Sequence, residues 1–175
     1  MQTFLTLQTT NFDLIAQTLD NKRLHKQALE GWQILMTLVQ LDPDGNDRTP
    51  KGWVNHPAVL MWKGHESALL AYITAMVKEW RNRGYQSSIL EKAIKTYVQA
   101  LRMNRTGLTG YPDWMRDPDR FERVASSHRR ALLAKNYAWY SQFEWKEDEG
   151  FAPTGYEYVW ELPLKSVTNP LPTYR

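Results

Sequence analysis

The chain has 175 residues, 42% of them hydrophobic, which fits one domain with a buried core. The absence of cysteine excludes disulfides, cysteine-ligated zinc sites and thiol nucleophiles. A net charge of +3 is only mildly basic, so any nucleic-acid role has to come from clustered lysines and arginines.

The first part of the chain predicts two helices. Asn11 is a suitable cap for a short helix over 12–19, and Asp20 for a longer one that follows. Apolar residues of the longer helix recur every three or four positions and share one face: Leu24, Ala28, Trp32, Leu35 and Val39. The opposite side carries three cations and one carboxylate: Lys22, Arg23, Lys26 and Glu30. That side is either a solvated surface or a place where phosphates meet a carboxylate.

The stretch 55–85 predicts one long central helix around which the chain packs. Pro57 suits the first helical turn, and Gly84 is a suitable stop. Its apolar face consists of Val59, Trp62, Leu69, Ile73, Met76, Val77 and Trp80. The preceding loop, 41–54, becomes basic and aromatic in its second half through Arg48, Lys51 and Trp53. This half is either a phosphate-contacting rim or a solvated loop.

The second part predicts two more helices and an extended tail. A helix over 89–103 has the apolar face Leu90, Ala93, Ile94, Tyr97 and Leu101, and a long loop follows it. The helix from Asp117 places His128 among the core residues Phe121, Val124, Ala125 and Leu132. Its basic cluster consists of Arg129, Arg130 and Lys135. The acidic and then aromatic stretch 144–175 is expected to wrap the helices as extended chain.

Several classes of site are not supported. The four histidines, at 25, 56, 65 and 128, are too scattered for a metal signature, and no glycine-rich phosphate loop is present. We therefore expect neither a metal nor a cofactor. No apolar run is long enough for a membrane span, and the start of the chain lacks the features of a signal peptide. We expect a cytoplasmic protein with no membrane partner.

Three blocks of sequence resemble the pyrimidine-dimer DNA glycosylase family. LDNKRLHKQALEG, at 19–31, is similar to the family's catalytic-helix block, and the stretch 55–85 to its central helix. The later block, YPDWMRDPDRFERVASSHRRALLAKNYAWY at 111–140, is similar to that of bacterial relatives. In order and spacing, the blocks span about residues 1–145.

The resemblance implies a fold and an organisation. The fold is all-α, a compact single-domain helical bundle around a long central helix, with irregular loops and an extended C-terminal tail. Residues 1–145 would form the helical domain, and 146–175 the tail packed on it. We expect a monomer.

The resemblance also implies a chemistry. In this family the N-terminal α-amine attacks C1′ of the damaged nucleotide and forms a Schiff base, with a helix carboxylate assisting. Carried over, Glu30 is the catalytic carboxylate, and the nucleophile is the amine of Met1, of a processed Gln2, or a lysine such as Lys26. The expected DNA contacts are Lys22, Arg23, Lys26, Lys51, His56, Arg129, Arg130 and Lys135.

The expected function is a DNA-repair N-glycosylase, with or without AP-lyase activity. Its partner would be double-stranded DNA that contains an ultraviolet pyrimidine dimer or another altered base. The alternative is a non-catalytic protein that binds damaged or bent duplex DNA. A more distant alternative is a helical protein-interaction module that uses the surplus tryptophans and tyrosines.

Overall fold

Helices supply the regular structure of the protein. A computed structural model describes residues 2–49, 52–107 and 109–162, and no strand occurs among them. The helices are α1 (Phe12–Thr18), α2 (Asn21–Val39), α3 (Pro57–Leu60), α4 (Glu66–Asn82), α5 (Ile89–Arg102), α6 (Asp113–Arg116), α7 (Pro118–Lys135) and α8 (Tyr137–Tyr140), followed by a short 3₁₀ helix (Ser141–Phe143). The all-α prediction is confirmed. None of the described helices is long and apolar enough to cross a membrane.

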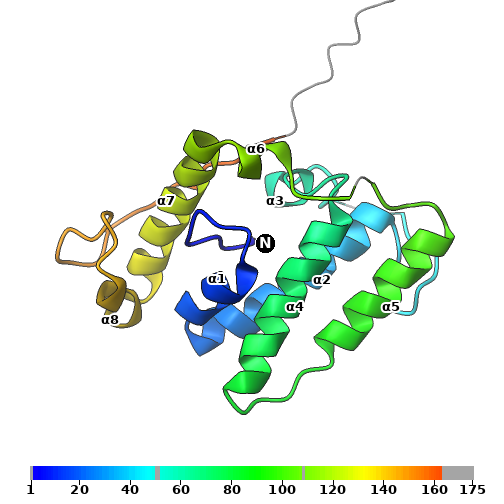
Figure 1. Cartoon of the computed structure of the whole chain (residues 1–175), viewed down its shortest axis with the longest axis horizontal. Helices are drawn as coiled ribbons and strands as arrows, with labels where there is room; N and C mark the ends of the chain where they lie inside the picture. Colours follow the sequence, from blue (N-terminus) through cyan, green and yellow to red (C-terminus); the bar gives the residue numbers. More distant parts are fainter. Residues whose placement is uncertain (1, 50–51, 108, 163–175) are drawn as a thin grey trace, which may run out of the picture.

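Helices α2 and α4 pack closely against each other at the centre of the molecule (Figure 1). Asp20 caps α2 as predicted, because its side chain accepts a hydrogen bond from Arg23 N. Gly31 allows the close approach of the two helices, since a Cβ there would lie 2.7 Å from Cγ1 of Ile73 on α4. Glu30 is the residue before this glycine, so the packing of α2 on α4 fixes the backbone that carries it.

The predicted central helix over 55–85 is wrong in one respect, because it consists of two helices. The chain leaves α3, turns at 61–65, and begins α4 at Glu66. Gly64 has φ +82 in this turn, a left-handed conformation that glycine adopts without steric cost. The predicted apolar residues are nevertheless buried, except Trp80, which is half-buried.

The predicted apolar face of α5 is wrong in part, since Ala93 is buried and Leu90 and Tyr97 pack against the core, but the other two residues do not. Ile94 and Leu101 are 44% and 48% exposed, whereas the buried line consists of Ile89, Ala93, Thr96 and Ala100. Small side chains bring α5 close to α2, where Trp32 Nε1 donates to Thr96 Oγ1 at 3.0 Å. A buried threonine with a partner therefore replaces larger apolar residues at this contact.

The segment Gln2–Thr6 runs through the interior as extended chain, between α7 and the α2–α4 pair (Figure 1). Its backbone bonds to side chains rather than to another strand. Phe4 N donates to Gln27 Oε1 at 2.7 Å, and Leu5 N donates to His128 Nδ1 at 3.0 Å. These bonds satisfy buried peptide groups and hold the start of the chain against α2 and α7.

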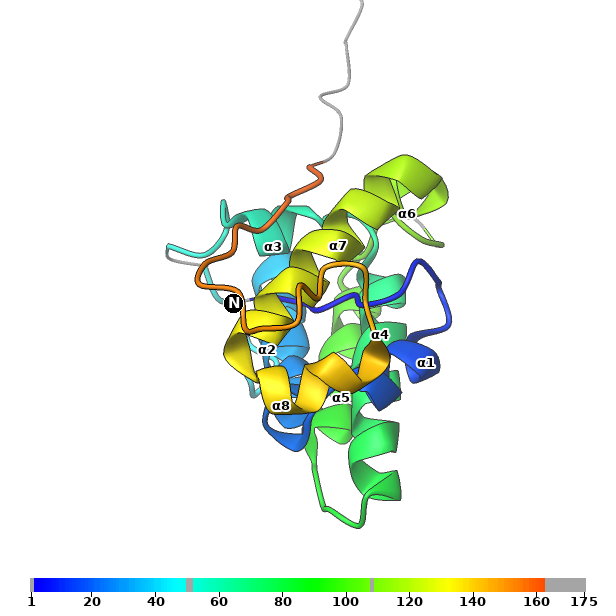
Figure 2. The same cartoon turned by 90° about the vertical axis from the view of Figure 1, so that its left-hand side faces the viewer.

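The last described residues run back alongside α7 (Figure 2). Val159 N donates to Ser127 Oγ at 3.1 Å, and Glu161 pairs with Arg120 and Arg123, each at 2.9 Å. The predicted core residues of α7 are buried, and so is His128, as expected of a core histidine. The remainder of the predicted tail, 163–175, lies outside the described residues, and the division at 145/146 stays a prediction.

Candidate active site

Glu30 lies beside the start of the chain. Its Oε2 accepts hydrogen bonds from Gln2 N at 3.1 Å and from Gln27 Nε2 at 3.4 Å, and Lys26 Nζ lies 3.8 Å from its Oε1. The Glu30 side chain is 13% exposed, whereas that of Lys26 is 65% exposed. A largely buried carboxylate thus meets the first described backbone amide of the protein.

Gln27 connects the N-terminal segment to Glu30. Its Oε1 accepts from Phe4 N, and from the Tyr72 hydroxyl at 2.8 Å, while its Nε2 donates to Glu30. Gln27 is 1% exposed, so water does not compete for these bonds. One side chain, three positions before Glu30 on α2, therefore sets the spacing between the carboxylate and the start of the chain.

Glu30 opens onto two hollows. The first, which we call the Glu30 pocket, has a volume of about 390 Å³ and is lined by Gln2, Phe4, Lys22, Arg23, Lys26, Gln27, Glu30, Lys135 and Tyr158. The second measures about 480 Å³ and is lined by Leu29, Glu30, Trp32, Gln33, Met36, Thr37, Pro43, Arg48 and Trp53. One hollow is rich in cations and the other in apolar and aromatic side chains, and the carboxylate belongs to both.

Four predicted cations meet at the Glu30 pocket. Lys22, Arg23 and Lys26 come from α2, and Lys135 from the end of α7. Arg23 is held in place, since its NH1 lies 3.1 Å from Asp20 Oδ2 and its NH2 donates to the Lys135 carbonyl at 3.2 Å. Positive charge from distant parts of the chain therefore surrounds one carboxylate, a setting that suits phosphate groups.

Comparison with known proteins gives one match. Residues 1–93, 93 of the 175 in the chain, match the family model described as pyrimidine dimer DNA glycosylase. The chain belongs to this family. No match was found among curated proteins or among solved structures. Membership supports a DNA glycosylase activity and a DNA substrate in general, and the matched span contains Glu30, Gln27 and the N-terminal segment.

Two predicted DNA contacts of this glycosylase lie away from the Glu30 pocket. Arg129 is 7% exposed; its Nε and NH2 bond to Glu147 and Glu122 at 2.7 and 2.6 Å, and its NH1 donates to Thr6 O at 3.1 Å. Burial opposes its charge, but these carboxylates raise the pKa of Arg129 above its ordinary value. We do not include Arg129 in the proposed DNA contacts, because all three guanidinium nitrogens already have partners.

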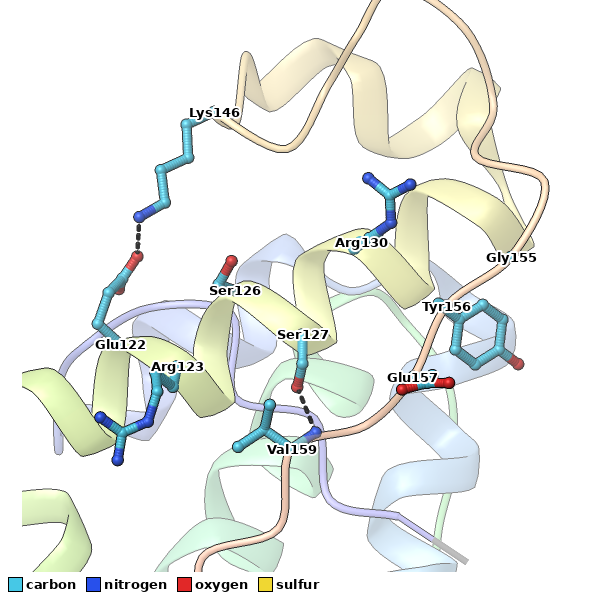
Figure 3. Close-up of a pocket in the computed structure, with 10 residues that line it drawn as sticks. All are labelled: Glu122, Arg123, Ser126, Ser127, Arg130, Lys146, Gly155, Tyr156, Glu157 and Val159. Carbon is cyan, nitrogen blue, oxygen red and sulfur yellow. Dashed lines mark hydrogen bonds and ion pairs between the residues drawn. The ribbon is translucent and has the colours of Figure 1, made fainter.

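Arg130 lines a different pocket, between α7 and the last described residues (Figure 3). This pocket has a volume of about 830 Å³, larger than the Glu30 pocket. Its charged side chains are largely paired, Arg130 with Glu149 at 3.2 Å and Lys146 with Glu122 at 2.7 Å. Size alone therefore does not indicate the active site in this molecule.

The other predicted site residues are placed as follows. His56 caps α3, where its Nδ1 accepts from Ala58 N at 3.1 Å, and its ring contacts Trp53 and Trp160. Burial lowers the pKa of His56, against the opposing charge of Glu30. Met1 and Lys51 lie outside the described residues. The described residues contain no group of three or more acidic or histidine side chains that could hold a metal ion.

Sequence reasoning missed two residues of the site. Gln27 precedes Glu30 by one helical turn, and that spacing, which places both on one side of α2, was the available signal. Tyr158 comes from the tail, where aromatic residues alternate with other residues in YEYVWE, residues 156–161. Alternation indicates extended chain with one aromatic side, but not which part of the molecule that side contacts.

Proposed function

We propose that the protein is a DNA N-glycosylase that removes ultraviolet pyrimidine dimers, or another altered base, with Glu30 as the catalytic carboxylate and an amine at the start of the chain as nucleophile. The observation that carries the proposal is the 3.1 Å contact between Gln2 N and Glu30 Oε2 inside a pocket lined by four cations. Gln2 directly follows Met1 in the sequence, so the contact involves the residue next to one expected to carry the amine.

The amine would attack C1′ of the damaged nucleotide. As the nitrogen–C1′ bond forms, the glycosidic bond breaks, and the base leaves with the bonding electron pair and takes up a proton. Loss of a proton from nitrogen and opening of the sugar ring then give a Schiff base. An α-amine has a pKa of about 8, so a useful fraction is neutral at physiological pH.

Glu30 would act at two stages. Its negative charge stabilises the positive charge that develops at the sugar during attack. In an AP-lyase step it would accept the C2′ proton, after which the C3′–oxygen bond breaks and the 3′ phosphate leaves. Lys22, Lys26 and Lys135 would hold the flanking phosphates through charge-assisted contacts.

The test is borohydride trapping on ultraviolet-irradiated and untreated duplex DNA. We expect a covalent protein–DNA band and strand nicks on irradiated DNA only, with the adduct on the N-terminal peptide after proteolysis. Glu30→Gln should lower turnover by at least about 100-fold and retain DNA binding. Glu91→Gln, which removes an exposed carboxylate of α5, is the matched control.

Two outcomes would contradict this proposal. A trapped adduct on Lys26 would show that the nucleophile is this lysine and not the N-terminal amine. DNA retention without nicks, adduct or released base on any irradiated substrate would leave the alternative, a non-catalytic protein that binds damaged or bent duplex.

A further inference from the structure

Residues 156–161, which we call the aromatic segment, alternate between two sides. Val159 faces α7, where its N–H bonds to Ser127 (Figure 3), and Glu161 is paired with two arginines of the same helix. In extended chain, residues two apart lie on one side, and the rings of Tyr156, Tyr158 and Trp160 contact one another in that order. The sequence alternation therefore becomes a segment with one anchored side and one aromatic side.

The aromatic side continues into a row of five rings. Ring centroids are 5.3 Å apart for Tyr156 and Tyr158, and 5.5 Å apart for Tyr158 and Trp160. The row then passes to His56 at 5.6 Å and to Trp53 at 5.0 Å. It joins the aromatic segment to the loop before α3.

The row borders both hollows that share Glu30. Tyr158 lines the Glu30 pocket, and Trp53 lines the second hollow. At the other end of the row, Lys135 Nζ donates to the Tyr156 hydroxyl and also lies over that ring, 4.2 Å from its centroid. The row of rings therefore borders the same two hollows as Glu30, and one of these hollows also holds the cations expected to bind phosphate.

These rings are held in position but not fully covered. Tyr158 packs on Phe4 and His128, with centroids 6.2 and 5.8 Å apart, and remains only partly buried. Trp53 is 47% exposed. Fixed aromatic surfaces next to cations suit nucleotides, since bases stack on the rings while phosphates meet the cations.

We propose that Tyr158, Trp160 and Trp53 form an aromatic wall on which an unstacked base of the DNA packs, and that this wall determines how strongly the protein prefers distorted over fully paired duplex. The inference rests on the proposed function of the Glu30 pocket. Two of the three residues lie beyond residue 93, so part of the selectivity would come from chain outside the span that matches the family model.

The test measures binding in a Glu30→Gln background, which prevents turnover. Dissociation constants are compared for a duplex with one pyrimidine dimer, a duplex with one unpaired base, and a fully paired duplex. Tyr158→Leu and Trp53→Leu should each reduce the preference for the first two by about tenfold, because a lost stacking contact weakens binding of the exposed base. Tyr158→Phe keeps the ring and should keep the preference.

Phe143→Leu is the matched control. It removes a ring that stacks on Trp145, with centroids 5.2 Å apart, and that lines neither hollow at Glu30. Its preference for the two distorted duplexes should equal that of the Glu30→Gln protein without further change. If Tyr158→Leu fails to fold, as judged by thermal unfolding, Trp53→Leu carries the test, since its side chain is already half exposed.

The outcomes separate this inference from the proposed function. If both leucine variants keep the preference for distorted duplex, and Glu30→Gln still loses turnover, the proposed aromatic wall is wrong and the proposed glycosylase function stands. If the preference depends on these rings but the wild-type protein shows no turnover on any substrate, the aromatic wall is supported and the proposed glycosylase function is wrong.

Discussion

Protonation of His128 should destabilise the protein in mild acid. His128 is fully buried, and its Nδ1 accepts from Leu5 N, so the folded state requires the neutral ring. Burial is the main cause that lowers its pKa from 6.5 to about 3. As the pH falls below 6.5, the unfolded chain takes up this proton first, and stability is lost between pH 6.5 and about 3.

The size of the effect follows from this difference in pKa. Lowering the pH from 7 to 5 should reduce the free energy of unfolding by about 2 kcal/mol, because each pH unit below the ordinary pKa costs about 1.36 kcal/mol. The two carboxylates that pair with Arg129 have pKa values lowered from 4.5, so their contribution to stability is lost mainly below about pH 4.5, outside the interval from pH 7 to pH 5. The loss of stability between pH 7 and pH 5 is therefore assigned mainly to His128.

The measurement is urea unfolding at pH 7 and pH 5 for the wild type and for His128→Asn, whose side-chain oxygen can still accept a hydrogen bond. The wild type should lose about 2 kcal/mol more than the variant between the two pH values. Equal losses in the two proteins would refute the assignment to His128.

Three further predictions concern other parts of the structure. Arg129→Met should cost about 3–5 kcal/mol in urea unfolding, because it leaves the largely buried Glu147 carboxylate without its cation and the Thr6 carbonyl without its donor; a loss of DNA affinity without a loss of stability would contradict this role. Gly31→Ala should lower the thermal unfolding temperature despite a better helix propensity, because the new Cβ meets Ile73 at 2.7 Å, and an unchanged or higher temperature would show that Ile73 moves aside easily. Lys22→Gln and Lys26→Gln should each reduce the slope of log affinity against log salt by about 0.9, and an unchanged slope would remove that lysine from the interface.

Local patterns predicted α2 and its polar side well. Asp20 is a strong cap, and the helical period alone places Lys22, Lys26 and Glu30 on one side, whatever the rest of the chain does. The same period failed at 61–65, where apolar residues continue in phase across a turn. Gly64 was the only local signal there, and a single glycine is also tolerated inside helices.

Tertiary contacts explain what the sequence did not predict. Arg129 was grouped with Lys135 by charge, although it follows Ala125 by four positions and precedes Leu132 by three, which places it on the buried face of α7. Its carboxylate partners made that position acceptable for a cation. The contact between Gln2 and Glu30 joins residues 28 positions apart, beyond the range of any helical period.

The buried start of the chain also constrains the order in which the protein is completed during synthesis. Leu5 and Thr6 leave the ribosome among the first residues, but their partners His128 and Arg129 each follow 123 positions later. At about 5–20 residues per second, the first residues wait on the order of ten seconds for α7. The Glu30 pocket, which includes Lys135 at the end of α7, therefore assembles only after α7 has been made, and a product truncated before α7 would lack that side of the pocket.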